Sequence, residues 1–422
     1  MSGRECRAGT GLLPSTAVLE LTYRCNHECI FCSCPWYASG FEQMPETPVS
    51  EWKGLLDALA LQGVSEFAFT GGEPLLKEGW REIVRHAGTL RVRRPVQGSS
   101  DDGRPGLHLI SNGRAMTDDD LRFLAGSGVH LMFSLPGLET YPEHTGGGSP
   151  ERVLSLFEKA AALGSAATVG VTVTRRNLHE VYSTIGEAFL AGAGELLLNR
   201  FLPGGRGLAH WRHLTLDRKE AGRMLDEAEA ALRASGRRGH VGTELPRCGF
   251  DASGLVRLQV GTRCRAAHQF FVVDPSGFAR VCNHSPTRLL HWKEMERLWE
   301  EPHWRRFALH QHEAATCAGC ASSHVCDAGC PEAARMVSGL PARDRAILFE
   351  AIARRLAYEP TVENRNRKRL RPNPVAPWEL RVGPLRVYFD VKEEPRRTVT
   401  IQAVGIKDRS RLLIGGEEVE LR

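Results

Sequence analysis

Long apolar runs are missing from this 422-residue chain. No stretch approaches the ~20 consecutive apolar residues that a bilayer-spanning helix needs. The first residues, MSGRECRAGTGLLPST, carry no apolar segment after their basic residues, whereas a secretory signal would. We therefore expect a cytoplasmic protein without a membrane partner. The sequence also lacks internal repeats, the dinucleotide-binding glycine fingerprint and the phosphate-binding Gly-Lys-Ser/Thr loop, which excludes the nucleotide sites that depend on them.

Cysteines, in contrast, are numerous and clustered. Disulfides rarely persist in a reducing cytosol, so clustered cysteines there more often bind metal or take part in catalysis. Only Cys6 of the twelve stands apart. The other eleven form two groups, for which the sequence predicts metal binding or catalysis. The first group is Cys25, Cys29, Cys32 and Cys34, and the second is Cys248, Cys264, Cys282, Cys317, Cys320, Cys326 and Cys330.

Composition and charge fit a globular protein of two or three domains. The chain is 42% hydrophobic and 25% charged, which allows large buried cores. Its net charge is +5, yet residues 331–422 alone hold 19 Lys and Arg against 13 Asp and Glu. This basic C-terminal segment on a nearly neutral body suggests a separate module that meets an anionic partner.

The fold class expected for residues 15–240 is α/β, because short apolar runs alternate there with amphipathic stretches. Such repeats predict a parallel sheet covered by helices, and six of them would form a partial (β/α)6 barrel. In such a sheet the chemistry lies at the carboxyl ends of the strands. The expected strands are residues 17–23, 66–70, 107–111, 129–135, 167–174 and 195–201, and helices are expected at 49–63, 149–164 and 217–235.

The rest of the chain changes character twice. Residues 241–335 are irregular and rich in cysteine. Residues 336–422 contain a helical stretch at 341–360 and a basic run at 364–372. Strand-like runs follow at 378–382, 385–391, 398–404 and 411–421.

The first cysteine group has the spacing C-x3-C-x2-C and follows the first expected strand. Three thiolates on one loop can hold three irons of a cubane cluster and leave the fourth iron open. Zinc would usually take four ligands. Cys34 is a poor fourth ligand if the chain is extended, because a two-residue step from Cys32 would point it away. Structural zinc remains the alternative.

With Phe31 as the aromatic residue, this C-x3-C-x-aromatic-C pattern resembles the signature of the radical S-adenosylmethionine (SAM) superfamily. The resemblance implies a [4Fe-4S] cluster held by Cys25, Cys29 and Cys32, whose open iron chelates SAM. Reductive cleavage of SAM then yields a 5′-deoxyadenosyl radical that abstracts hydrogen from the substrate. The cofactor carries the difficult chemistry, and the protein orients it.

Further motifs stand at the expected strand ends. The segment FTGGEPLL resembles the superfamily's Gly-Gly-Glu motif, although a simple turn is the alternative. Glycines there would let the backbone approach the SAM methionine, and the glutamate would accept hydrogen bonds from its ammonium group. The implied SAM contacts are Phe31, Gly71, Gly72, Glu73, Pro74, Asn112, Ser134 and Arg200, the last as a partner of the SAM carboxylate; the catalytic acid or base is unknown.

The second cysteine group resembles the SPASM extension, which carries two auxiliary [4Fe-4S] clusters, and we assign it to residues 241–335. By that resemblance Cys248, Cys264, Cys282 and Cys330 hold the first auxiliary cluster, and Cys317, Cys320 and Cys326 hold the second. The chain has no cysteine after Cys330. The second cluster would therefore have an open iron, take His324 or Asp327, or fail to assemble. A zinc knuckle of Cys317, Cys320, Cys326 and Cys330 is the alternative.

Residues 336–422 resemble RelE/ParE-like toxin domains, small α+β folds of two helices on an antiparallel sheet. The first strand of such a domain is replaced here by residues 324–333, which belong to the cysteine run. The resemblance implies contact with RNA, the ribosome or an antitoxin; a solvated basic surface is the alternative. The candidate RNA contacts are Lys368, Arg381, Arg386, Tyr388 and Lys407.

The resemblances together favour a radical SAM enzyme that modifies a peptide or protein with help from an external electron donor. A small-molecule substrate stays open. The second function is a RelE/ParE-like ribonuclease or RNA-binding module with vestigial metal sites, and the third is a zinc-binding scaffold.

Overall fold

The computed structural model describes residues 13–37, 41–92, 103–311, 317, 319–338, 361–373, 375–382, 385–392, 398–408, 411–414 and 417–418. Contacts divide the chain into two compact units. The first unit comprises residues 1–312 and 324–330, and the second comprises residues 313–323 and 331–422. Cys6 and the predicted helix at 341–360 lie outside the described residues.

The first unit is built around a ten-stranded sheet of order β10-β9-β1-β2-β3-β4-β5-β6-β7-β8. Strands β1 to β6 are parallel neighbours, which confirms the predicted α/β sheet. β1 ends three residues before its predicted end, because the Thr22 hydroxyl and the Tyr23 amide donate to the Glu46 carboxylate instead of continuing the ladder. The six strands are Thr16–Glu20, Glu66–Thr70, Gly106–Ser111, His130–Ser134, Thr168–Val173 and Glu195–Arg200.

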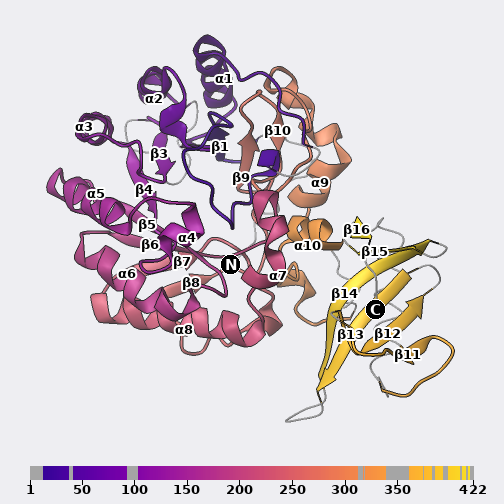
Figure 1. The fold of residues 1–422 in the computed structure, drawn as a ribbon. Coiled ribbons are helices and arrows are strands. Elements are labelled where there is room, and N and C mark those ends of the chain that lie inside the picture. The colour runs from indigo at the N-terminus through magenta and orange to yellow at the C-terminus, as the bar shows by residue number, and fades with distance from the viewer. Residues whose placement is uncertain are drawn as a thin grey trace. The chain divides into compact units, whose positions relative to one another are not determined.

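Helices cover one side of these strands, and Figure 1 shows α1, α2, α3, α5, α6 and α8 along the outer side of the sheet. Their apolar faces form the core with the strands; the rings of Phe133 on β4 and Phe157 on α5 meet edge to face at 5.5 Å. Asp217 and Glu220 form a capping box that starts α8 close to its predicted position. The helices are α1 Val49–Leu61, α2 Trp80–Thr89, α3 Asp118–Gly126, α4 Tyr141–Thr145, α5 Pro150–Ala162, α6 Val181–Leu190, α7 Trp211–Leu214 and α8 Arg218–Ser235.

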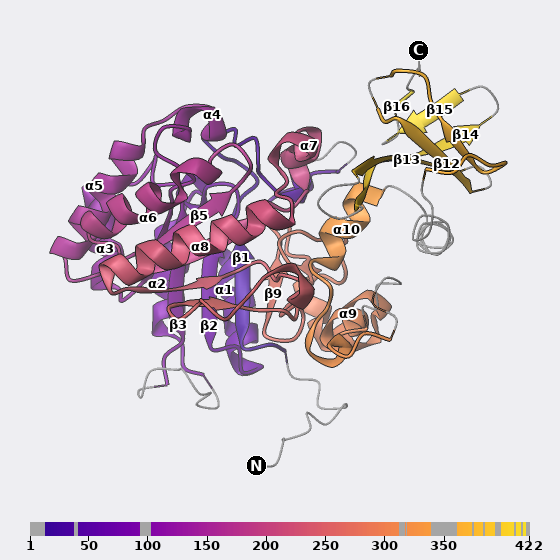
Figure 2. The same ribbon diagram turned by 90° about the horizontal axis from the view of Figure 1, so that it is seen from below.

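Four short strands that the sequence did not predict extend the same sheet. β7 (Arg238–Val241) and β8 (Leu258–Val260) follow β6 at one end. β9 (Phe270–Val273) pairs in parallel with β1, as Figures 1 and 2 show, and β10 (Ala279–Arg280) pairs with β9 in antiparallel. A 3-10 helix, η6 (Trp292–Glu300), and α9 (Pro302–Ala308) follow. The cysteine-rich segment is thus joined to the first strand of the chain.

The second unit contains α10 (Pro331–Ser338) and a six-stranded antiparallel sheet of order β11 to β16. Its core is formed by alternate residues such as Leu380, Val387 and Phe389. The predicted strands are present, and the last run is divided between two strands. The strands are Arg367–Arg369, Trp378–Val382, Leu385–Lys392, Thr398–Asp408, Arg411–Ile414 and Glu417–Glu418. Many folds contain such a sheet, so the RelE/ParE resemblance stays a prediction.

Within the part of the chain that the structure describes, no helix combines the length and the apolar character needed to cross a membrane.

Candidate functional site

A cavity of about 180 Å³ lies where β2, β3 and β4 end at their carboxyl sides and β5 passes beside them. This is the edge at which parallel α/β sheets place their chemistry. The sequence predicted eight of the lining residues. They are Cys25, Cys29, Phe31, Cys32, Gly71, Gly72, Asn112 and Ser134.

The loop that carries the first cysteine group is held in place by backbone hydrogen bonds to α4. The amide of Glu28 donates to the carbonyl of Thr145 at 2.9 Å, and the amide of Ile30 donates to the carbonyl of His144 at 3.0 Å. A tight turn then brings the Cys32 amide within 3.1 Å of the Cys29 carbonyl. Three cysteine side chains from one short segment therefore reach one cavity.

The surroundings of these thiols suit metal-bound thiolates. The His27 amide and the Asn112 side-chain amide lie 3.5 Å and 3.7 Å from the Cys25 sulfur, as donors to it. Burial raises the pKa of Cys25 and of Cys29, so the free thiols resist ionisation. Bound iron would supply the positive charge that thiolates need here. The donor set fits a cubane cluster with three protein ligands.

Cys34 also lines the cavity, which corrects the expectation that it points away. The chain after Cys32 is not extended: a 3-10 turn at Pro35–Tyr37 follows, and the Tyr37 amide donates to the Cys34 carbonyl. The Cys34 thiol lies 3.9 Å from the Gly71 carbonyl oxygen. A hydrogen bond from Cys34 lowers the pKa of Cys32, and the same bond raises the pKa of Cys34.

Gly71 and Gly72 let the loop after β2 press against the loop that carries Cys25. The two loops are in direct backbone contact. The Gly72 amide donates to the Thr22 carbonyl at 2.9 Å, and the Glu73 amide donates to the Arg24 carbonyl at 2.8 Å. Gly71 has a φ of +130°, and a Cβ on it would lie 2.7 Å from the Thr22 carbonyl oxygen. A Cβ on Gly72 would clash with the Arg24 carbonyl. Both positions thus require glycine.

Glu73 is fully buried and does not line the cavity, in contrast to the expected contact with SAM. Its carboxylate accepts hydrogen bonds from the Ser111 hydroxyl at 2.8 Å, the Asn112 amide at 2.9 Å and the Leu75 amide at 3.3 Å. Pro74 is likewise buried and starts the 3-10 turn η2 (Pro74–Leu76) that Glu73 caps. Glu73 therefore ties the loop after β2 to the end of β3.

Burial raises the pKa of Glu73 to about 7, against an ordinary 4.5. Between those two values the folded chain holds a proton that the unfolded chain has lost, so folding stability falls as the pH rises from 4.5 to 7. The fall amounts to about 3 kcal/mol at 1.36 kcal/mol per pKa unit. A Glu73→Gln variant of the cluster-free protein should lack this fall, as urea unfolding at pH 5 and pH 7.5 would measure. Equal pH dependence of variant and parent would contradict the protonated carboxyl.

Residues 203–207, PGGRG, follow β6 and were missed by the sequence reasoning. Gly205 has a φ of +48°, and a Cβ there would clash with the Cys34 carbonyl. The Gly207 amide donates to the Cys32 carbonyl at 3.0 Å. Arg206 lines the cavity, donates to the Cys29 carbonyl at 3.4 Å and stacks on Tyr37 at 4.5 Å. The Gly-Gly-Arg sequence at residues 204–206, just after a predicted strand, was the signal that could have identified this segment as part of the site.

The structure separates the three predicted contacts at the later strand ends. Asn112 and Ser134 line the cavity, and the Asn112 side chain also donates to Asn26 at 2.8 Å. Arg200 does not line the cavity. Its guanidinium donates to the Glu244 carbonyl at 3.2 Å instead. The predicted pairing of Arg200 with the SAM carboxylate is therefore not supported by its position.

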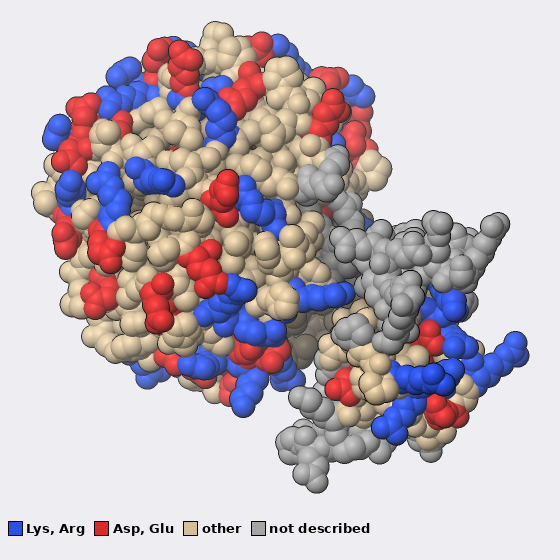
Figure 3. All heavy atoms as spheres, in the orientation of Figure 1, with Lys and Arg blue, Asp and Glu red and all other residues tan. Residues whose placement is uncertain are grey.

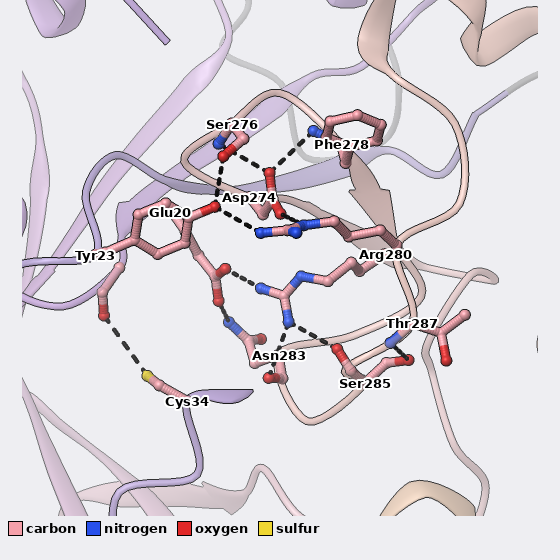
Figure 4. Close-up of polar contacts among 12 residues, drawn as sticks. Glu20, Tyr23, Cys34, Asp274, Ser276, Phe278, Arg280, Asn283, Ser285 and Thr287 are labelled. Carbon is pink, nitrogen blue, oxygen red and sulfur yellow. Dashed lines mark hydrogen bonds and ion pairs between the residues drawn. The ribbon is translucent and has the colours of Figure 1, made fainter. Parts of the chain in front are cut away.

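A buried polar network joins the end of β1 to the segment after β9, as Figure 4 shows. Glu20 and Arg280 form an ion pair with at most 1% of either side chain exposed. Asn283 donates to the second oxygen of Glu20 at 3.1 Å. Beside it, the Tyr23 and Ser276 hydroxyls are hydrogen-bonded at 2.5 Å. The network fixes the residues around Cys282 against the start of the first cysteine loop.

The second cysteine group is divided between the two units: Cys317 and Cys320 fall in the second, and the other five in the first. Asp327, offered by the sequence as a replacement ligand, already accepts the Cys264 amide at 2.7 Å and faces His310 Nδ1 at 2.9 Å. It therefore ties the segments that carry Cys264 and Cys330. Across the described residues, no three His, Cys, Asp or Glu side chains converge on a point that could hold one metal ion.

The five candidate RNA contacts of the second unit differ in exposure. Tyr388 is only 1% exposed, so the structure contradicts its role as a surface contact. Arg381 and Arg386 both form ion pairs with Glu379. Lys368 and Lys407 are exposed. Figure 3 shows Lys and Arg side chains gathered on the described part of this unit, where Arg365, Lys368, Arg369 and Arg371 are exposed.

Comparison with known proteins agrees with the geometry of the cavity. Residues 19–188 match the Radical SAM superfamily. Sporulation killing factor maturation protein SkfB of Bacillus subtilis is 27% identical over 49% of this chain and 48% of its own. Mycofactocin maturase MftC of Mycolicibacterium smegmatis is 26% identical over 78% of this chain and 80% of its own length. PqqA peptide cyclase of Rhodopseudomonas palustris is 30% identical over 44% of this chain and 46% of its own length. The chain thus spans about half the length of two of these relatives.

Solved structures share the fold. Streptococcus suis SuiB bound to S-adenosylmethionine has a TM-score of 0.59 at 14% identity, over 76% of this chain and 73% of that one. SuiB bound to the precursor peptide SuiA has a TM-score of 0.57 at 14% identity, over 76% of this chain and 72% of the SuiB chain. The chain therefore contains a radical SAM domain with peptide-maturase relatives. A [4Fe-4S] cluster and SAM are the cofactors of that superfamily.

Proposed function

We propose that this protein is a radical SAM enzyme that cleaves SAM reductively and modifies a peptide or protein substrate. The observation that carries the proposal is the cavity at the strand ends, which gathers Cys25, Cys29 and Cys32 from one loop. The glycine pair at 71–72 packs that loop against the next one. A three-thiol loop with one iron left open is what SAM binding requires.

Each part of the chain has a role in this chemistry. Cys25, Cys29 and Cys32 would hold the cluster, and the amide donors at Cys25 stabilise its thiolate. Asn112 and Ser134 supply polar groups to the cavity, where they would orient SAM. A cluster held there, together with SAM and an external electron donor, would supply the one-electron chemistry that removes a hydrogen atom from the substrate. Glu73 keeps the two loops in register.

The peptide or protein substrate is supported by the relatives. One is named a maturation protein, one a maturase and one a peptide cyclase, and SuiB has been seen with the precursor peptide SuiA. The auxiliary clusters are part of the same proposal: Cys248, Cys264, Cys282 and Cys330 would hold the first, and Cys317, Cys320 and Cys326 the second. A RelE/ParE-like activity of residues 336–422 has weaker support, because Tyr388 is buried and two of the candidate arginines are paired with Glu379.

The first test is the formation of 5′-deoxyadenosine by the protein after anaerobic reconstitution with iron and sulfide. With SAM and dithionite, the parent should form product, and a Cys29→Ala variant should fall to the background of the protein-free reaction. Cys6→Ala is the matched control, since Cys6 lies in neither cysteine group, and it should behave as the parent.

The substrate class is tested by co-expression with short reading frames that flank the gene. A peptide mass that changes with the parent but not with Cys29→Ala would support the proposal. Cleavage of RNA without SAM, together with no deoxyadenosine from an iron-loaded parent, would reject it in favour of the RNA-directed function.

A further inference from the structure

Arg200 is the last residue of β6, and its side chain lies in an unusual setting. Its amide donates to the Thr243 hydroxyl at 3.0 Å, and Nη2 donates to the Glu244 carbonyl at 3.2 Å. Nε is buried and has no hydrogen-bond partner among the described residues. No carboxylate in the described ranges forms an ion pair with the guanidinium. The half-buried Arg200 guanidinium thus has a buried Nε without a partner and no carboxylate partner among the described residues.

A buried N–H donor without a hydrogen-bond partner is unfavourable by about 1–3 kcal/mol. Burial accordingly lowers the pKa of Arg200, while the nearby Cys330 and Glu244 act in the opposite direction. Glu244 is a poor counter-ion, because burial raises its pKa and favours its neutral form.

The chain next to Cys330 packs directly on the guanidinium. A Cβ built on Gly329, which has a φ of +99°, would lie 3.4 Å from Arg200 Nη2. Cys264 shares this environment: burial raises its pKa most, and the charges of Glu244, Cys330 and Asp327 raise it further. Asp327 in turn binds the Cys264 amide, so the segments of Cys264 and Cys330 are held together. The half-buried residues Cys264 and Cys330 and the Arg200 guanidinium therefore lie in the same region.

We propose that Arg200 is the counter-ion and N–H donor of an iron–sulfur cluster ligated by Cys264 and Cys330, and that it is not a ligand of SAM. This inference rests on the auxiliary cluster of the proposed function. Each reduction adds one electron to a cluster that thiolates already make anionic. A fixed positive charge and N–H donors beside it stabilise the reduced form and raise the midpoint potential.

The experiment measures that potential in the full-length, reconstituted protein. A background with Cys25, Cys29 and Cys32 all changed to Ala removes the SAM cluster, and the signal that disappears in a further Cys264→Ala variant identifies the auxiliary cluster. Redox titration followed by electron paramagnetic resonance then compares Arg200 with Arg200→Met and Arg200→Lys. We expect Arg200→Met to lower the midpoint by about 59 mV or more, which is a tenfold shift in a one-electron equilibrium. Arg200→Lys, which keeps the charge, should lie between Met and the parent.

Loss of auxiliary iron from Arg200→Met with retention in Arg200→Lys would also support the proposal, since the charge would then be needed to hold the cluster. An unchanged potential in Arg200→Met overturns it. So does loss of iron from both variants, or a parent without a Cys264-dependent signal.

A separate arm tests the role first expected from sequence. In protein with the first cysteine group intact, equilibrium dialysis with labelled SAM compares Arg200→Met with the parent. Weaker SAM binding at an unchanged auxiliary potential would assign Arg200 to the SAM carboxylate instead. If the Arg200 variants shift the auxiliary potential as expected but the parent forms no deoxyadenosine, the proposed function is rejected and this inference stands.

Discussion

A Gly72→Ala variant is expected to lose about a hundredfold in deoxyadenosine formation, because a misplacement of about 1 Å at a reaction centre has effects of that size. The added methyl group would clash with the Arg24 carbonyl, one residue before Cys25. The obstacle is backbone, so the loop itself must move. The hydrogen bonds from residues 72 and 73 to Thr22 and Arg24 would break with it. Iron content after reconstitution should fall in parallel.

Gly222→Ala provides the matched control for this variant. Gly222 lies within α8, and a Cβ there would meet nothing within 4 Å. In a helix, alanine is more stable than glycine by about 1 kcal/mol, so this variant should be slightly more stable than the parent. Its activity should equal that of the parent. Parent-like iron content and deoxyadenosine formation by Gly72→Ala would show that the two loops are not packed as described.

The second large effect is expected at the buried ion pair of Glu20 and Arg280. Arg280→Met leaves Glu20 buried without its cation, which should reduce the free energy of unfolding by about 3–5 kcal/mol. Trp36 is a built-in probe, since its ring lies 5.7 Å from the Arg280 guanidinium. Urea unfolding followed by tryptophan fluorescence would measure the loss.

Two further variants give this result its meaning. The double variant Glu20→Gln/Arg280→Met removes both charges and should regain much of the stability, because the single change is harmful through the unpaired charge it leaves. Arg297→Met breaks the exposed pair with Glu294 and should change stability by less than about 1 kcal/mol. A loss in the double variant equal to that in Arg280→Met would mean that packing rather than charge explains the effect.

The six central strands could be predicted because each is a short, mostly apolar segment of five or six residues that is followed by a helix. β2 is the clearest case, since the predicted and observed bounds are both 66–70. β8, β9 and β10 have only two to four residues each, too few for a periodic pattern. Their strand character comes from pairing with distant partners, as β9 does with β1. The sequence of a short segment alone does not indicate which distant strand it pairs with.

The candidate site could be predicted where residue type and spacing decide the chemistry, as with Cys25, Cys29 and Cys32. Side-chain direction could not be predicted. Cys34 faces the cavity because a 3-10 turn follows it, and a strand-like alternation was the wrong local geometry. Arg200 stands at the expected strand end, but its side chain lies toward Glu244. Tertiary packing sets the direction of both side chains, and the pattern of residues along the sequence does not contain it.

The parallel pairing of β9 with β1 also bears on how the chain folds during its synthesis. Thr16 pairs with Phe270, so the two strands leave the ribosome about 250 residues apart. At 5–20 residues per second, the edge of β1 that β9 will occupy waits on the order of 10–50 s for its partner. An unpaired edge of that kind is open to strands from neighbouring chains. A chain truncated before residue 270 would keep this edge open permanently.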